Sequence, residues 1–252
     1  MTILDSLPPR SGNDFTGVDM ADQRVWLDVP YQEKDQAKAL GARWDPSAKR
    51  WYAARAGVDG LQRWEALPDV PTLLPGEDRA FGSGLFVDLV PSSCWFTNVR
   101  SCVDQRDWER LRRMVLQRAD NRCEGCGRGE ARPEQRWLEV HERWSYDDRA
   151  RVQALRRLIC LCTDCHRTTH FGLAQVKGLA EPALAHLMAV TGMSRPQANE
   201  HVRTAFQLWE QRSRTTWVLD LAMLTSAGVT IVPPPEAARR AAVAEQTLRT
   251  RR

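Results

Sequence analysis

Two matched cysteine pairs constrain the fold of this chain more than any other feature of its sequence. Cys123 and Cys126 form one C-x-x-C pair, Cys162 and Cys165 form the other, and 35 residues separate the pairs. Four thiolates in such pairs make a closed tetrahedral zinc site. A redox C-x-x-C is the alternative, but the thioredoxin-like pattern that accompanies it is missing. The sequence therefore predicts a structural zinc ion that joins the two ends of the intervening segment.

The other cysteines and the hydropathy of the chain bear on its compartment. Seven cysteines are an odd number, so we interpret Cys94, Cys102 and Cys160 as small buried apolar side chains rather than disulfide partners. No apolar run approaches the ~20 residues of a membrane span. The start, MTILDSLPPRSGNDF, lacks the basic and apolar regions of a signal peptide. We expect a cytoplasmic protein without a membrane segment, and the sequence leaves the oligomeric state open.

Composition and periodicity divide the chain into five parts and indicate the α+β class. The parts are a flexible lead-in (1–22), a small strand-helix-hairpin module (23–66), a Pro/Gly-rich linker (67–84), a zinc-bound domain with C-terminal helices (85–232) and a basic tail (233–252).

Within the large domain, hydrophobic periodicity predicts the individual elements. Strands are expected at 85–91 and 136–148, and helical stretches at 104–120, 149–158, 178–192 and 194–228. Ser194 is the expected N-cap of the last stretch, which Gly192 separates from the one before it.

The small module has a recognisable pattern of its own. It reads V-x-L-x-V-P-Y from Val25, G-A-R-W-D from Gly41, and then Trp51-Tyr52. This pattern resembles a small domain of unknown function that recurs in primase-like and mobile-element proteins. Its tryptophans either stack on a nucleic acid strand or form the core of a module too small to have another.

The region around the cysteine pairs resembles a nuclease family. A strand delivers His141 and Glu142, and an apolar segment then leads into C-x-x-C-H, with His166 directly after Cys165 and His170 four residues later. Over roughly residues 105–175 this arrangement resembles the HNH, or His-Me finger, nucleases. The resemblance implies a zinc-knuckle ββα-metal finger, embedded here in a mainly helical domain, that holds one divalent cation against a scissile phosphate.

Roles follow from the resemblance residue by residue. His166 matches the second histidine of the family, a metal ligand, and His170 a further ligand or phosphate contact. If His141 is a ligand, Glu142 takes the place of the general base; if His141 is the base, Val140 stands where a ligand is expected. Arg157 stands where the family has a base-orienting Asn. Because Arg accepts no hydrogen bond, it would contact phosphate instead. The catalytic ion would be Mg²⁺, Mn²⁺ or Ni²⁺.

The arginine-rich positive charge of the chain indicates a nucleic acid partner. The net charge is +4, and arginine carries most of the positive sign. Arginine suits phosphate because its planar fork binds bidentately. The expected DNA contacts are Arg112, Arg113, Arg143 and Arg167, and the sequence does not distinguish duplex from single strands. Solvated helix faces are the alternative interpretation of these clusters.

Two functions remain open from the sequence. The first is a metal-dependent endonuclease that hydrolyses DNA. The second is a zinc-stabilised nucleic-acid-binding module with the same fold and no turnover, which the unusual residues Glu142 and Arg157 favour. A third possibility, within the second, is that His141, His166 and His170 only pack against the knuckle.

Overall fold

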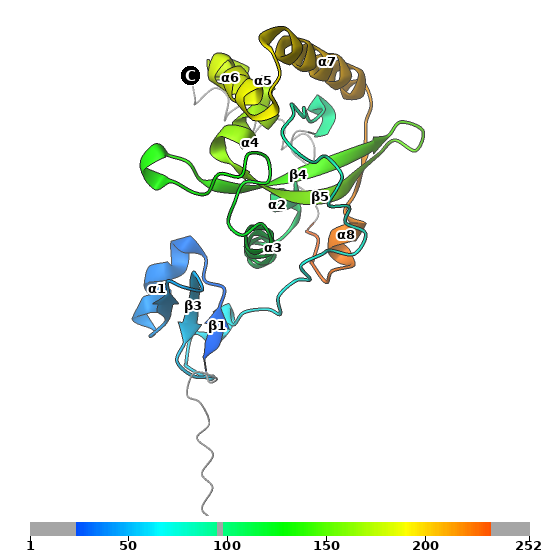
Figure 1. Cartoon of the computed structure of the whole chain (residues 1–252). Coiled ribbons are helices and arrows are strands. Elements are labelled where there is room, and N and C mark those ends of the chain that lie inside the picture. Colours follow the sequence, from blue (N-terminus) through cyan, green and yellow to red (C-terminus); the bar gives the residue numbers. More distant parts are fainter. Residues whose placement is uncertain (1–23, 95–97, 233–252) are drawn as a thin grey trace, which may run out of the picture. The chain divides into compact units, whose positions relative to one another are not determined.

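The structure is a computed structural model that describes residues 24–94 and 98–232, and it divides into two compact units (Figure 1). They are Met1–Ala66 and Leu67–Arg252. The expected lead-in (1–22) and basic tail (233–252) lie outside the described residues. Each unit contains one three-stranded sheet together with helices. The expected α+β class is therefore confirmed, and among the described residues no helix is long and apolar enough to cross a membrane.

The first unit has the expected strand, helix and hairpin. Its elements are β1 (Val25–Leu27), η2 (Tyr31–Glu33), α1 (Lys34–Ala39), β2 (Arg43–Asp45), β3 (Arg50–Ala53) and η3 (Gln62–Trp64). The sheet order is β1-β3-β2, and both neighbours of β3 run antiparallel to it. The Asp45 carboxylate closes the β2–β3 turn by accepting hydrogen bonds from the backbone N–H groups of Ser47 and Ala48. Leu27, Ala37 and Trp64 are buried at the centre of the unit.

The second unit is built on a long antiparallel hairpin. Strands β4 (Leu138–Asp147) and β5 (Val152–Cys162) pair in a register that places His141 opposite Ile159, and β6 (Val218–Asp220) runs parallel to β5. The segment 149–158, expected to be helical, instead belongs to the turn and to β5. Leucines at 155, 158 and 161 have helical spacing, but residues 157–162 are all buried and their backbone pairs with β4.

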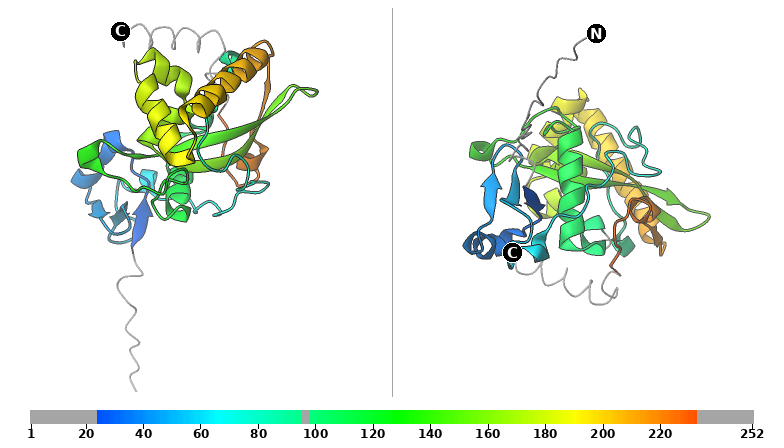
Figure 2. Two further views of the ribbon diagram at one scale, coloured as in Figure 1. Left: turned by 45° about the horizontal axis from the view of Figure 1, so that its top comes forward. Right: turned by 90° about the horizontal axis from the view of Figure 1, so that it is seen from below.

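Helices cover both faces of this hairpin. They are α2 (Val99–Cys102), α3 (Gln105–Arg118), α4 (Thr163–Thr169), α5 (Phe171–Val176), α6 (Ala180–Thr191), α7 (Arg195–Ser213) and α8 (Ala222–Thr225), with 3-10 turns η4 (Ser92–Cys94) and η5 (Arg132–Glu134). Helix α3 lies along one face of the hairpin, while α4 lies on the other and leads into the α6–α7 pair (Figures 1 and 2).

Local sequence signals fix several helix ends. Asp104 caps α3, because its carboxylate accepts the backbone N–H of Asp107 at 2.8 Å. The backbone turns at Gly192, which adopts φ 74°, and Ser194 then caps α7 as expected. The expected helical stretch 194–228 was wrong beyond Ser213, where the chain enters β6 and then the short α8.

The segment expected to be a linker packs onto the second unit. Val70 and Leu74 are buried in its core. Glu77 accepts two hydrogen bonds from the guanidinium of Arg118, each 2.6 Å long, and its carboxylate also accepts the backbone N–H of Leu158. This buried ion pair holds 67–84 against α3 and β5, so the linker interpretation was wrong.

The strand expected at 85–91 is also absent, although these residues lie within the described range. Leu85 and Val87 are buried without strand partners. The backbone N–H of Val87 donates instead to Nε2 of His201 in α7, and that of Asp88 donates to the carbonyl of Thr169. The segment therefore joins the histidine-bearing face of the hairpin to the C-terminal helices.

Candidate metal centres

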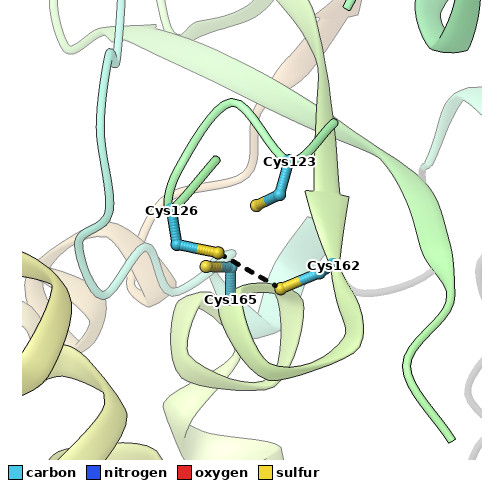
Figure 3. A group of neighbouring side chains, drawn as sticks. All are labelled: Cys123, Cys126, Cys162 and Cys165. Carbon is cyan, nitrogen blue, oxygen red and sulfur yellow. Dashed lines mark hydrogen bonds between the residues drawn. The ribbon is translucent and has the colours of Figure 1, made fainter. Parts of the chain in front are cut away.

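The four cysteines of the two C-x-x-C pairs meet at one point. Cys123 and Cys126 lie in the loop after α3, Cys162 is the last residue of β5, and Cys165 lies in α4 (Figure 3). Their sulfur atoms lie within 4.8 Å of one another, and those of Cys126 and Cys162 are 3.6 Å apart. A tetrahedral zinc with ~2.3 Å bonds requires sulfur separations of about 3.8 Å. These four residues could therefore hold a structural metal such as zinc, as predicted.

Side chains around the cysteines connect the loop that carries Cys123 and Cys126, here called the knuckle loop, to the β4–β5 hairpin. Glu124 accepts the backbone N–H of Cys160 at 2.8 Å and the guanidinium of Arg157 at 2.7 Å. Burial by itself would raise the pKa of Glu124, but these donors together lower it, so the carboxylate stays charged. Arg157 is 5% exposed. Its guanidinium is thus paired with Glu124 and largely shielded from solvent, and its contact with a phosphate stays a prediction.

The three remaining cysteines are buried, as the sequence analysis expected. Cys94, Cys102 and Cys160 lie in the hydrophobic interior, each no more than 3% exposed. Burial raises the pKa of Cys160 to about 12, which keeps this thiol protonated and unreactive.

The structure also brings three histidines together. His141 comes from β4, His166 from α4, and His170 from the junction between α4 and α5. Their ring centroids are 4.6 to 5.3 Å apart, and one ring nitrogen from each lies within 4.8 Å of the others. Burial lowers the pKa of all three, that of His170 to about 3, so the rings are neutral. Neutral imidazole is the form that binds a metal ion.

His141 provides an observation that packing alone does not explain. Its side chain is 2% exposed, and neither ring nitrogen has a hydrogen-bond partner among the described residues. Leaving a buried polar group unsatisfied costs about 1–3 kcal/mol. A cation held between His141, His166 and His170 would satisfy one of these nitrogens, so the donor set fits a divalent ion that prefers nitrogen ligands.

Glu139 joins this cluster, although the sequence analysis did not nominate it. Its Oε2 lies 3.2 Å from Nδ1 of His166, which leaves Nε2 of that ring for a metal. The Glu139 side chain is 40% exposed and thus sits at the rim of the cluster. Period-two alternation from His141 could have identified it, since residues i and i+2 of a strand share a face.

Glu142, the expected base, is not part of the histidine cluster. Adjacent residues of a strand point to opposite faces, so the side chain of Glu142 points away from that of His141. Its Oε1 accepts the backbone N–H of Val99 in α2 at 2.9 Å. Burial raises the pKa of Glu142 to about 7. The carboxylate therefore caps α2 on the α3 side of the hairpin.

The four arginines expected to contact DNA have different surroundings. Arg143 is completely buried, with its guanidinium 4.0 Å from the ring centre of Phe86 and 3.4 Å from the Asp88 carboxylate. The expectation of a surface contact was wrong for Arg143. Arg113 pairs with Asp69 and Arg167 with Asp164, whereas Arg112 lies on the exposed side of α3.

Comparisons with known proteins concern the first unit. Residues 24–65 match the family model Domain of unknown function (DUF5710). Two proteins of Escherichia coli, both named DNA primase TraC, are 57% identical to the chain over 54 residues and 49% identical over 62 residues. These matches cover 21% and 23% of this chain but only 5% and 4% of the relatives. They agree with the resemblance of the small module to a domain of primase-like proteins. No solved structure matches the chain significantly.

Proposed function

We propose that the second unit is a metal-dependent endonuclease of the HNH type that hydrolyses phosphodiester bonds of DNA. One observation carries this proposal: three imidazoles, one buried and two half-buried, converge beside a four-cysteine cluster, and helix α4 contributes to both groups. The cysteines leave no open coordination position for a substrate, whereas three histidines leave several. The two clusters thus suit a structural and a catalytic ion, respectively.

The residues of the histidine cluster have separate tasks in this proposal. The divalent ion would be held by His141, His166 and His170. Because their rings are neutral, they do not repel one another and each offers a nitrogen lone pair to the ion. When bound, the ion supplies positive charge beside the scissile phosphate and stabilises the leaving oxygen. Glu139, at the rim and in contact with His166, orients that ring and is placed to accept a proton from the attacking water.

Exposed basic groups of the second unit support a nucleic acid substrate. Arg112 and Arg132 are exposed, and the Arg128 side chain is 45% exposed at the knuckle loop. The first unit is also similar to short segments of two proteins named DNA primase TraC, which supports nucleic acid as a partner.

The second candidate is a zinc-stabilised binding module without turnover. It is favoured by Arg157, which stands at the expected Asn position and is occupied by its ion pair with Glu124. It is also favoured by Glu142, which faces away from the histidines. In this case the surface would bind DNA while the site lacks a complete set of proton-transfer groups.

A nicking assay on supercoiled plasmid, with Mg²⁺, Mn²⁺ and Ni²⁺ in turn, separates the two. The endonuclease proposal expects nicking by the zinc-loaded wild-type protein and a loss of about 100-fold or more for His166→Ala. The matched control is His201→Gln, which removes a histidine outside the cluster, keeps an acceptor for the Val87 N–H and should leave nicking intact. Wild-type protein that is folded and zinc-loaded, yet leaves plasmid uncut with all three ions, would favour the binding module.

A further inference from the structure

Helix α1 and the β2–β3 hairpin of the first unit form a surface in which aromatic rings and lysines alternate. The Lys34 ammonium lies 3.7 Å from the ring centre of Tyr31, and the Lys38 ammonium lies 5.8 Å from that of Trp51. Trp51 contacts Trp44 edge-on, with 5.4 Å between ring centres. Lys34 and Lys38 are one helical turn apart and therefore share a face of α1. We call these five residues the aromatic–lysine surface.

Two rings of this surface are unusually open to solvent. Tyr31 is 76% exposed and Trp44 is 48% exposed. The core of the unit does not require them, because Leu27, Leu61 and Trp64 fill its centre. Large aromatic side chains that contribute this little to a core are characteristic of binding surfaces.

The opposite face of the same sheet provides a contrast. Trp26 and Tyr52 point there, each with an arginine beside its ring as Tyr31 has Lys34, but they are less open to solvent than Tyr31 and Trp44. Arg24 lies 4.9 Å from the ring centre of Tyr52, and Arg50 lies 5.5 Å from that of Trp26. Both rings are half-buried. Among the described residues of the first unit, the exposed rings are thus confined to the aromatic–lysine surface.

The charges on the surface favour an anionic occupant. Lys34 and Lys38 lie beside the rings. Asp35 contacts Lys38 at 3.5 Å, so its negative charge offsets the positive charge of Lys38 but not that of Lys34. Glu33 is directed to the core, where its carboxylate accepts the indole N–H of Trp64 at 2.6 Å. Rings that can stack on bases, next to ammonium groups that can bind phosphates, are the combination that recognises unpaired nucleotides. A duplex does not fit as well, because its bases are already stacked on one another.

We propose that the aromatic–lysine surface binds single-stranded nucleic acid, with bases stacked on Trp44 and Tyr31 and the backbone phosphates bound by Lys34 and Lys38. This activity belongs to the first unit and does not depend on whether the second unit cleaves DNA. The same chemistry serves DNA and RNA strands, so both are included in the test.

The test measures the fluorescence anisotropy of labelled ten-nucleotide oligo(dT) and oligo(U) with the full-length protein. Trp44→Ala and Tyr31→Ala should each weaken binding about five-fold or more, the loss expected for one base–aromatic stack. Trp44→Phe should retain most of the affinity, because phenylalanine can still stack. The matched control is Trp137→Ala, since Trp137 is a similarly exposed tryptophan (45%) of the second unit.

Two lysine variants test the electrostatic half of the proposal. Lys34→Gln and Lys38→Gln should each make the dependence of log affinity on log salt shallower by about 0.7, the value for one phosphate contact on a single strand. Tighter binding of oligo(dT) or of oligo(U) would identify the natural strand. The proposal is overturned if neither oligonucleotide binds, if Trp44→Ala binds like the wild type, or if Trp137→Ala loses as much affinity as Trp44→Ala.

Discussion

Glu139 and Glu142 lie three residues apart on β4, yet their side chains have different surroundings. Glu139 contacts His166 at the rim of the histidine cluster, whereas Glu142 caps α2 on the other face. The sequence analysis nominated Glu142 because it follows His141 directly, as in the motif of the family. Because side chains alternate along a strand, His141 shares its face of the sheet with Glu139, two residues away, and not with Glu142. The cysteines were predictable because their spacing is local, while the carboxylate required knowledge of which way β4 faces.

This difference gives a test with two conservative variants. Glu139→Gln should lower the cleavage rate about 100-fold or more, because it removes both the proposed general base and the partner of His166. Glu142→Gln should leave the rate within about two-fold, because its amide oxygen can still accept the Val99 N–H. Single-turnover nicking rates measure both. A larger loss for Glu142→Gln than for Glu139→Gln would return the role of base to Glu142.

The cysteine cluster allows an equally local prediction. Cys165→Ser should abolish stoichiometric zinc and lower the melting temperature, because one of four thiolate ligands is lost. Cys160→Ala is the matched control: it removes a buried thiol next to the cluster and should retain one zinc per chain. Elemental analysis and thermal unfolding measure the two effects. Fully stable, zinc-free Cys165→Ser protein would contradict the zinc assignment.

At the scale of elements, the sequence predicted features that depend on local hydrogen bonds better than features that depend on pairing between distant segments. Local hydrogen bonds mark the starts of α3 and α7: the N-cap Asp104 accepts the Asp107 N–H, and the N-cap Ser194 donates its own N–H to Gln197. Strand β5 could not be read in this way, since its leucines have helical spacing and only pairing with β4 makes it a strand. The packing of 67–84 was equally hidden, because Glu77 and its partner Arg118 are 41 residues apart.

The buried Glu77–Arg118 pair should stabilise the second unit measurably. The two side chains are 0% and 4% exposed, so Glu77→Ala would leave the Arg118 charge buried and unpaired. We expect the free energy of unfolding to fall by about 3–5 kcal/mol. Asp69→Ala is the control, because it breaks the pair of Arg113 with a carboxylate that is 70% exposed and should cost less than about 1 kcal/mol. Urea denaturation compares the two variants, and equal losses would contradict this account.

The contact between α7 and residue 87 should depend on pH. Nε2 of His201 can accept the Val87 N–H only while the ring is neutral, and burial lowers the pKa of this histidine below its usual 6.5. The unfolded chain therefore binds the proton first, so this stabilisation is present above pH ~6.5 and is lost as the pH falls below it. His201→Gln should reduce the drop in melting temperature between about pH 7.5 and about pH 5.5. If the fall in melting temperature is the same in His201→Gln and in the wild type, groups other than His201 cause it.

At the scale of the whole molecule, the residues that could bind a metal ion through sulfur or imidazole nitrogen are divided unevenly between the two units. Every cysteine and every histidine lies between residues 94 and 201, and the described part of the first unit has neither. The sequence analysis placed the end of the small module at residue 66, where the two units divide. The core of that module is made of local contacts between its own strands and helix, so its pattern could be read directly. The second unit depends on contacts between distant segments and could be read only in parts.

Removing zinc should therefore unfold one unit and spare the other. With a strong chelator and a thiol-modifying reagent, we expect amide hydrogen exchange to become fast in β4, β5 and α4, which carry or adjoin the cysteine ligands. Amides of β3 in the first unit should keep their protection. Mass spectrometry of peptides from both units measures this, and untreated protein is the control. Loss of protection throughout the chain would mean that the units do not fold independently.

Cys165 and His166 are neighbours on α4, so the two clusters share one short helix. An ion in the cysteine cluster fixes the position of α4, and an ion in the histidine cluster would require the same position. Each site therefore lowers the conformational cost of filling the other. Thermodynamic reciprocity then applies: by whatever factor the first ion raises the affinity for the second, the second raises the affinity for the first. In a cell, zinc supply would control the nuclease chemistry proposed for the second unit without zinc ever touching the substrate.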